Sequence, residues 1–312
     1  MQIITTLYQN NAIYKTNSQC MNYKKIAFKA NPTIPKYIDQ LAKTHSNKIT
    51  TFVSDFDGTI RNYYTNSIPN DTQTAFKKLI KIGVPVIIAT GRVSKELNLI
   101  KDFLEIQPEY YILGHGSHVA DKEGQLLYSK TLSRSQAQAI INYGKKYKQL
   151  HPHTKIYIKG KDFIEEIENS NNIDLNNVYL VMFREPQSTS YQTIMPMYNS
   201  LRYNLTNQGL NIFTSSPRCC EIINSNVNKQ IALSTLAEQI SLKIPNVAFI
   251  ADGNNDIDLM NFIRNHNGVS ISMGNASPEL LSCAEYTTDR ITDSGFAKAI
   301  DNIVKLNSKL TY

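Results

Sequence analysis

Hydrophobic residues recur along the chain in short runs that alternate with amphipathic segments. Runs at 49–54, 84–89 and 110–113 are almost wholly apolar, as in strands buried on both faces of a parallel sheet. Helical patterns follow two of them, at 69–80 and 96–104. The rhythm returns near the C-terminus, with helices expected at 229–240 and 256–263 and strands at 247–250 and 268–271. This order predicts an α/β fold with a doubly wound parallel sheet.

The pattern between these two blocks is different. Strands are expected at 126–128, 156–158, 178–183, 210–214 and 219–223, with one long helix at 133–148. Strands with fewer helices are typical of a separate α+β module. We therefore predict a core of residues 49–114 and 224–312, an inserted cap domain of residues 115–223, and a leader of residues 1–48 that is flexible or loosely attached.

The net charge of +7 is concentrated in this leader, which holds seven lysines and one acidic residue. The rest of the chain is almost neutral, whereas a nucleic-acid-binding domain would show a clustered basic face. Nucleic acid is therefore excluded as the main ligand. No apolar run reaches the 18 residues of a membrane span, so no span is expected.

The N-terminus, MQIITTLYQNNAIYK, lacks the basic and apolar regions of a secretory signal. Four cysteines without a CxxC spacing indicate neither a disulfide framework nor a zinc site. A cytoplasmic location is expected, with organelle import through the basic leader as the alternative. The oligomeric state is left open.

Polar residues follow the expected strands where ligands bind in parallel sheets, at the carboxyl edge. Asp55 and Asp57 follow the first strand, Thr90 the second, and Asp252 the strand at 247–250, while Lys229 begins a helix. Elements far apart in the sequence thus bring carboxylates, a hydroxyl and an ammonium to one edge.

This set suits phosphoryl transfer, which depends on neutralising charge and positioning the phosphoryl group. Asp55 and Asp252, with a backbone carbonyl, offer the oxygen ligands that Mg²⁺ prefers. Asp55 is then the nucleophile, and Asp57 protonates the leaving oxygen and activates water. Thr90 and Lys229 hold the phosphoryl oxygens.

Six segments in the same order resemble motifs of the haloacid dehalogenase superfamily, in particular its Cof-type subfamily. They are Asp55-Phe56-Asp57-Gly58-Thr59, Ile88-Ala89-Thr90-Gly91-Arg92, Lys229 within Asn226–Gln230, Ala251-Asp252-Gly253-Asn254-Asn255-Asp256, Ser272-Met273-Gly274-Asn275-Ala276, and Asp293-Ser294-Gly295-Phe296-Ala297. The resemblance spans about residues 49–304 and implies a Rossmann-like core with an inserted α/β cap.

The resemblance also implies roles for individual residues. Asp55 is the nucleophile and Asp57 the general acid and base. Mg²⁺ is held by Asp55, the Asp57 carbonyl and Asp252, with Asp256 in support. Substrate and phosphate contacts fall to Thr90, Gly91, Arg92, Lys229 and Asn255. The implied substrate is a small phosphorylated molecule, such as a sugar phosphate.

Several residues keep two interpretations. Asp256 and Asn255 either support the site or begin a helix, and Arg92 either binds substrate or pairs with a core carboxylate. Ala251 and His115 stand where the subfamily usually has Gly and an Asn-Gly-Ala segment. His115, Arg218 and Glu221 are either substrate contacts or, as is commoner, structural or solvated groups.

The sequence therefore predicts a magnesium-dependent phosphatase that acts through an aspartyl-phosphate on Asp55. One alternative is a phosphomutase of the phosphomannomutase type, which shares the first motif and a similar cap. The other is a non-catalytic protein that binds a phosphorylated metabolite.

Overall fold

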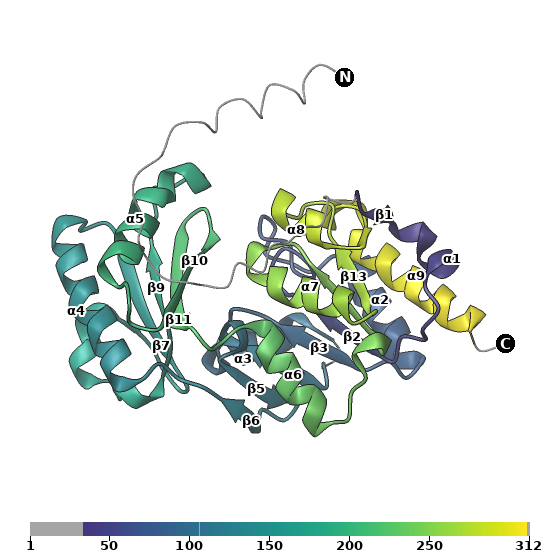
Figure 1. Ribbon diagram of the computed structural model, residues 1–312, viewed down its shortest axis with the longest axis horizontal. Coiled ribbons are helices and arrows are strands. Elements are labelled where there is room, and N and C mark those ends of the chain that lie inside the picture. The colour runs from purple at the N-terminus through teal and green to yellow at the C-terminus, as the bar shows by residue number, and fades with distance from the viewer. Residues whose placement is uncertain (1–33, 106, 311–312) are drawn as a thin grey trace, which may run out of the picture. The chain divides into compact units, whose positions relative to one another are not determined.

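The computed structural model describes residues 34–105 and 107–310, which contain two sheets (Figure 1). The larger sheet has nine strands in the order β1-β14-β13-β12-β2-β3-β4-β5-β6. Its strands are β1 (Lys36–Tyr37), β2 (Thr51–Ser54), β3 (Val86–Ala89), β4 (Tyr110–Leu113), β5 (His118–Asp121), β6 (Leu126–Ser129), β12 (Val247–Ala251), β13 (Val269–Ser272) and β14 (Tyr286–Thr287). Neighbouring strands from β1 through β4 are parallel, which confirms the predicted fold class.

Helices cover both faces of this sheet because its strands are apolar on both sides. On β2, Phe52 joins one buried cluster and Val53 the other. The first cluster also takes residues from α1 (Leu41–Thr44), α2 (Asn70–Lys81), α3 (Leu97–Phe103) and α9 (Gly295–Lys309). The second takes residues from α6 (Lys229–Gln239), α7 (Ile257–Asn265) and α8 (Pro278–Cys283). In the described residues, no helix has the length and apolar character needed to cross a membrane.

The inserted domain has its own antiparallel sheet, in the order β10-β11-β9-β7-β8. Its elements are α4 (Arg134–Leu150), β7 (Lys155–Gly160), β8 (Ile164–Glu166), β9 (Val178–Arg184), α5 (Tyr191–Asn204), β10 (Leu210–Ser216) and β11 (Cys219–Asn224). Apolar side chains of both helices pack on this sheet in a separate buried cluster. The domain thus has a core of its own, as the module predicted from the sequence requires.

The predicted start of the insert at residue 115 is wrong. Strands β5 and β6 form an antiparallel hairpin that extends the core sheet beyond β4. Val119 of β5 lies opposite Ile112 and is buried in the core with it. The insert therefore begins after β6, because backbone pairing and burial attach this hairpin to the core.

The predicted boundary of the leader at residue 48 is also wrong. Strand β1 pairs with β14, and Ile38, Leu41 and Ala42 are buried in the core. Hydrophobic burial makes these residues part of the folded domain. The prediction for residues 1–33 lies outside the described residues.

Candidate active site

The polar residues expected to meet do so at the carboxyl edge of three adjacent strands. Asp55 follows β2, Thr90 follows β3 and Asp252 follows β12, and these strands are neighbours in the parallel sheet. The Asp55 N–H donates to the carbonyl of Ile250 at 3.0 Å, which extends the pairing of β2 with β12. Parallel pairing therefore delivers residues that are far apart in sequence to one place.

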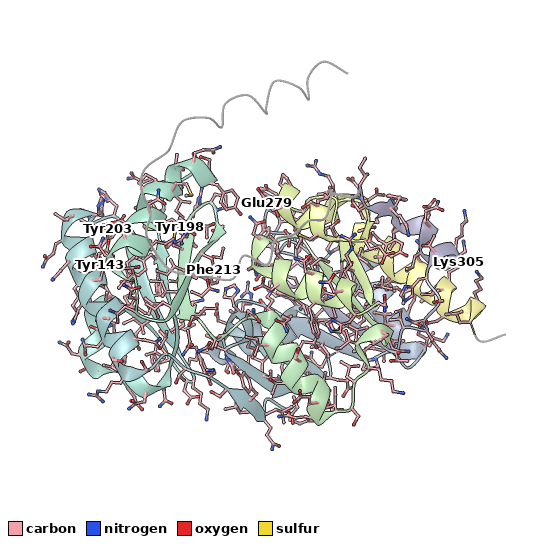
Figure 2. All side chains as sticks on the ribbon, viewed as in Figure 1. Tyr143, Tyr198, Tyr203, Phe213, Glu279 and Lys305 are labelled. Carbon is pink, nitrogen blue, oxygen red and sulfur yellow. The ribbon has the colours of Figure 1, made fainter. Side chains whose placement is uncertain are left out.

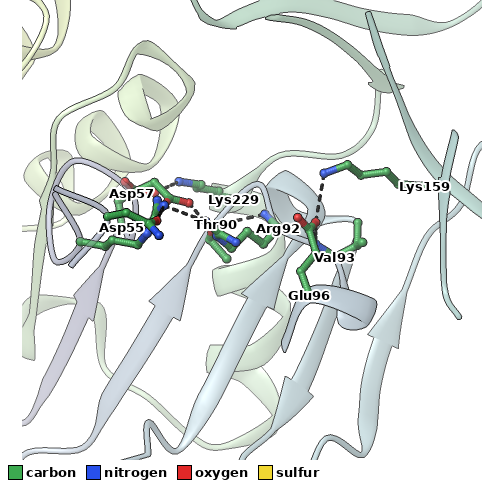
Figure 3. Close-up of polar contacts among 10 residues, drawn as sticks. Asp55, Asp57, Thr90, Arg92, Val93, Glu96, Lys159 and Lys229 are labelled. Carbon is green, nitrogen blue, oxygen red and sulfur yellow. Dashed lines mark hydrogen bonds and ion pairs between the residues drawn. The ribbon is translucent and has the colours of Figure 1, made fainter. Parts of the chain in front are cut away.

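Lys229 lies at the centre of this cluster, as the first residue of α6. Its side chain is fully buried, and its Nζ donates to Asp55 Oδ1 and to Asp256 Oδ1, each at 2.7 Å. Figure 3 shows Lys229 beside Asp55. The helix begins here because the Asn228 side chain accepts from the backbone N–H of Ile231 at 2.7 Å. This N-cap fixes where the ammonium enters the site.

The site holds more negative than positive charge. Burial raises the pKa of Asp55, and the Asp57 charge adds to this effect while Lys229 opposes it. Burial together with the charges of Asp55 and Asp256 raises the pKa of Asp252 well above its ordinary value. Burial likewise raises the pKa of Asp256 against the opposing effect of Lys229. Such a cluster gains stability from an added cation.

Asp252 is held against the loop that carries Asp57. Thr59 Oγ1 donates to Asp252 Oδ1 at 3.1 Å, and Asn275 Nδ2 lies 3.3 Å from Asp252 Oδ2 and 2.9 Å from the Gly58 carbonyl. Gly58 has φ +92°, and a Cβ there would lie 2.2 Å from Asp252 Oδ2. Only glycine fits this turn, which brings the loop backbone close to the Asp252 carboxylate.

The donor set fits a magnesium ion. Asp55 and Asp252 offer carboxylate oxygens, Asp57 adds a backbone carbonyl in the same loop, and the buried Asp256 Oδ2 has no hydrogen-bond partner among the described residues. Oxygen ligands of this kind suit Mg²⁺. In the part of the chain that the structure describes, no three His, Cys, Asp or Glu side chains form a metal-binding group. Asp55, Asp252 and the Asp57 carbonyl are thus the groups that would hold the ion.

The Asp57 side chain is bound by two arginines. Arg92 donates from Nε to Asp57 Oδ2 at 2.8 Å and from Nη2 to Asp57 Oδ1 at 3.0 Å (Figure 3). Arg61 forms a further ion pair with Asp57. Of the two interpretations of Arg92, the structure shows the pair with a core carboxylate. This fork fixes the orientation of the Asp57 carboxylate.

The remaining predicted contacts lie beside this cluster. Thr90 is buried, and its Oγ1 accepts from the Arg92 N–H at 3.2 Å. Gly91 faces the ring of His115, and Asn255 lies in the 3₁₀ turn Asn254–Asp256 with its Oδ1 close to Gly253. Their roles toward substrate stay predictions.

Sequence reasoning assigned no role to Arg61 or Asn275, although both support the site. Asn275 lies within the Met-Gly-Asn-Ala segment, so that segment was the available signal. Arg61 reaches Asp57 because the loop after Gly58 turns back on itself, with Gly58 N–H bonded to the Arg61 carbonyl at 2.7 Å. No sequence pattern predicted the contact between Arg61 and Asp57. Arg218, a candidate substrate contact, instead donates to the Ser188 carbonyl at 3.0 Å within the inserted domain.

Comparisons with known proteins agree with this geometry. A sequence profile of the haloacid dehalogenase-like hydrolases matches residues 52–300. The chain is 26% identical over 246 residues to the 5-amino-6-(5-phospho-D-ribitylamino)uracil phosphatase of Bacillus subtilis, covering 79% of this chain and 92% of that protein.

A relative from Streptococcus pyogenes, whose name pairs a phosphatase with a peptidyl-prolyl cis-trans isomerase, is 22% identical over 88% of this chain, which spans 58% of that protein's length. A phosphatase of the haloacid dehalogenase superfamily from Bacteroides thetaiotaomicron has the same fold, with a TM-score of 0.64 and 20% identity, over 83% of this chain and 96% of that one. The profile match over most of the chain shows the family: the chain belongs to the haloacid dehalogenase-like hydrolases.

Proposed function

We propose that the chain is a magnesium-dependent phosphatase that hydrolyses a small phosphomonoester through an aspartyl-phosphate on Asp55. The observation that carries the proposal is the buried ammonium of Lys229, 2.7 Å from both Asp55 and Asp256, beside Asp252 on the neighbouring strand. This arrangement can neutralise the phosphoryl oxygens while it keeps a carboxylate available to attack. The names of relatives that are phosphatases support the same reaction class.

In the first step, a carboxylate oxygen of Asp55 attacks phosphorus and the bond from phosphorus to the ester oxygen breaks. The departing oxygen takes a proton from the Asp57 carboxyl, which Arg92 orients. Thr90 and Lys229 hold the phosphoryl oxygens during the transfer. Mg²⁺, when bound by Asp55, Asp252 and the Asp57 carbonyl, supplies positive charge next to the phosphoryl group.

In the second step, the Asp57 carboxylate takes a proton from water, and the water oxygen attacks phosphorus. The bond between phosphorus and Asp55 breaks, inorganic phosphate leaves, and Asp57 carries the proton for the next cycle. The two steps return both aspartates to their starting states, so the protein is a true catalyst.

A small substrate is supported by two features. The inserted domain packs beside the site, with β10 next to the 3₁₀ turn Asn254–Asp256. The Bacillus subtilis relative is named for a small phosphorylated ribitylamino-uracil. We therefore propose that the substrate is a phosphomonoester with a compact leaving group.

The test is a panel of phosphorylated sugars, polyols and cofactors, with phosphate release measured in Mg²⁺ and in EDTA. We expect release that depends on Mg²⁺. A sugar phosphate that changes isomer without releasing phosphate would identify a mutase instead. Tight calorimetric binding without turnover across the panel would identify a binding protein.

A further inference from the structure

A polar contact joins the core to the inserted domain beside the active site. His115, in the 3₁₀ turn Gly114–Gly116 after β4, places its Nε2 against the carboxylate of Glu221 on β11. The side chains are 6% and 9% exposed, respectively. Phe213 of β10 packs edge-on against the His115 ring, with the ring centroids 4.8 Å apart, and Figure 2 shows Phe213 on the part of the inserted domain that faces the core. The core therefore contributes His115 to this contact, and the inserted domain contributes Glu221 and Phe213.

The backbone fixes the His115 ring against the loop that carries Thr90 and Gly91. His115 has φ 56°, and its N–H donates to the Thr90 carbonyl at 3.0 Å. A Cβ on Gly91 would lie 2.4 Å from His115 Nε2, so the ring rests directly on Gly91. A Cβ on Gly116 would lie 2.2 Å from the Asn228 carbonyl, so the same turn also touches the start of the Lys229 helix. The ring thus lies between the loops that carry Thr90 and Lys229.

This position faces the part of the substrate that leaves. Asp55, Thr90 and Lys229 approach the phosphoryl group from the sheet edge, so the ester oxygen and the rest of the molecule extend toward the inserted domain. His115 and Glu221 are polar groups between the core and the inserted domain, and each comes from a different domain. A movement of the inserted domain would separate them and open room between them.

Both side chains have hydrogen-bonding capacity that suits a ligand. His115 Nδ1 is buried and has no hydrogen-bond partner among the described residues. Burial opposes the charge of Glu221, but His115, and beyond it Lys159, outweigh burial and lower its pKa, so the group is a carboxylate that accepts hydrogen bonds. The ammonium of Lys159 donates to Glu96 of the core at 3.0 Å (Figure 3). A carboxylate and an imidazole together suit vicinal hydroxyls, one donating to the carboxylate and the other bonding to the ring.

We propose that His115 and Glu221 are the residues that select the leaving group, and that they take a polyhydroxylated one. Hydroxyls of the substrate insert between the two side chains when the inserted domain moves, and they replace the contact between them. A leaving group with a second anionic group is disfavoured because it would face the Glu221 carboxylate. This inference deepens the proposed function and rests on it.

The test compares two substrates in one protein. Sorbitol phosphate carries hydroxyls on its leaving group, and p-nitrophenyl phosphate carries none. In Glu221→Gln we expect the ratio of kcat/KM for sorbitol phosphate to that for p-nitrophenyl phosphate to fall about tenfold, because a charge-assisted hydrogen bond is lost. His115→Asn, whose new side chain tolerates positive φ, should lower the same ratio. The control, Glu166→Gln on the exposed end of β8, should leave it unchanged.

A ratio within about threefold of the parent value in Glu221→Gln would overturn the inference. Equal losses of kcat/KM with both substrates would leave the ratio unchanged. They would show that His115 and Glu221 only join the two domains. Absence of phosphate release from the parent with both substrates would count against the proposed function instead. In that case, sorbitol phosphate is titrated by calorimetry into the Asp55→Asn protein with and without the added Glu221→Gln substitution. An about tenfold weaker Kd with Glu221→Gln would support the role of the His115–Glu221 pair, and an unchanged Kd would overturn the inference.

Discussion

Lys229 shows how much of the site depends on one side chain. It is the cation bonded to both Asp55 and Asp256, and all three side chains are buried. Burial opposes the Lys229 charge, but the carboxylates, Asp256 first, outweigh burial and raise its pKa. Removing one partner of such a buried cluster leaves carboxylates without compensation.

We therefore expect Lys229→Met to abolish phosphate release and to lower the free energy of unfolding by about 3–5 kcal/mol. Urea unfolding in EDTA measures the second effect without a metal ion to replace the ammonium. Lys95→Met, at an exposed position in the 3₁₀ turn Ser94–Glu96, is the control and should change little. An unfolding midpoint equal to the parent's would show that Lys229 does not stabilise the two carboxylates.

At the scale of elements, the turn Gly114–Gly116 connects β4 to β5 and packs against the start of α6. Gly116 has φ +99°, and the Asn228 carbonyl occupies the space that a Cβ would need. Gly83, after α2, has φ +72° but nothing within 4 Å of a Cβ position. A side chain at Gly83 would therefore meet backbone strain alone, whereas one at Gly116 would meet both backbone strain and steric overlap.

Gly83→Ala should cost about 1 kcal/mol of unfolding free energy, the usual penalty for a left-handed residue. Gly116→Ala should cost at least about 2 kcal/mol more, because the turn must also move away from the Lys229 helix. Urea unfolding of both variants measures the difference. Equal losses in the two proteins would contradict the close approach of this turn to α6.

His118 on β5 joins the same elements to the inserted domain. Its ring stacks on Tyr179 of β9 with centroids 4.1 Å apart, and its Nε2 accepts from the Ser94 N–H at 3.1 Å. Burial lowers the pKa of His118 to about 3. Between that value and its ordinary value of 6.5, the unfolded chain binds a proton that the folded chain excludes.

Stability is therefore lost as the pH falls through 6.5, and the loss continues toward a pH of about 3. At about pH 5 the His118 contribution should be about 1–2 kcal/mol relative to neutral pH. Urea unfolding of the parent and of His118→Gln at both pH values tests this. Identical pH dependence in the two proteins would show that His118 is protonated in the folded state.

Physical reasons explain why sequence patterns missed or misassigned some elements. Helix α5 was not predicted, and it contains Pro196, which removes a backbone donor from the helix interior. The hairpin of β5 and β6 was assigned to the insert because its pattern does not reveal which sheet it joins. Strand β1 and helix α1 were assigned to the leader because their lysines concealed the buried Ile38 and Leu41.

At the scale of the whole molecule, the order of motifs predicted which side chains meet, since parallel strands place their carboxyl ends at one edge. The convergence of Asp55 and Asp252 followed from that rule, and Lys229 joins them from the first residue of α6. The contacts of Asp57 with Arg61 and of His115 with Glu221 did not, because they depend on how loops and two domains close. The reaction class was therefore readable from the sequence, and the groups that face the leaving group were not.

The assembled sheet edge is proposed to hydrolyse phosphomonoesters through Asp55. The most direct measurement is Mg²⁺-dependent phosphate release by the parent, by Asp55→Asn and by Asp102→Asn, the last at an exposed position on α3. We expect the parent and Asp102→Asn to be equally active and Asp55→Asn to lose at least about 10³-fold in kcat. Release by Asp55→Asn at a rate near that of the parent would show that Asp55 is not the nucleophile.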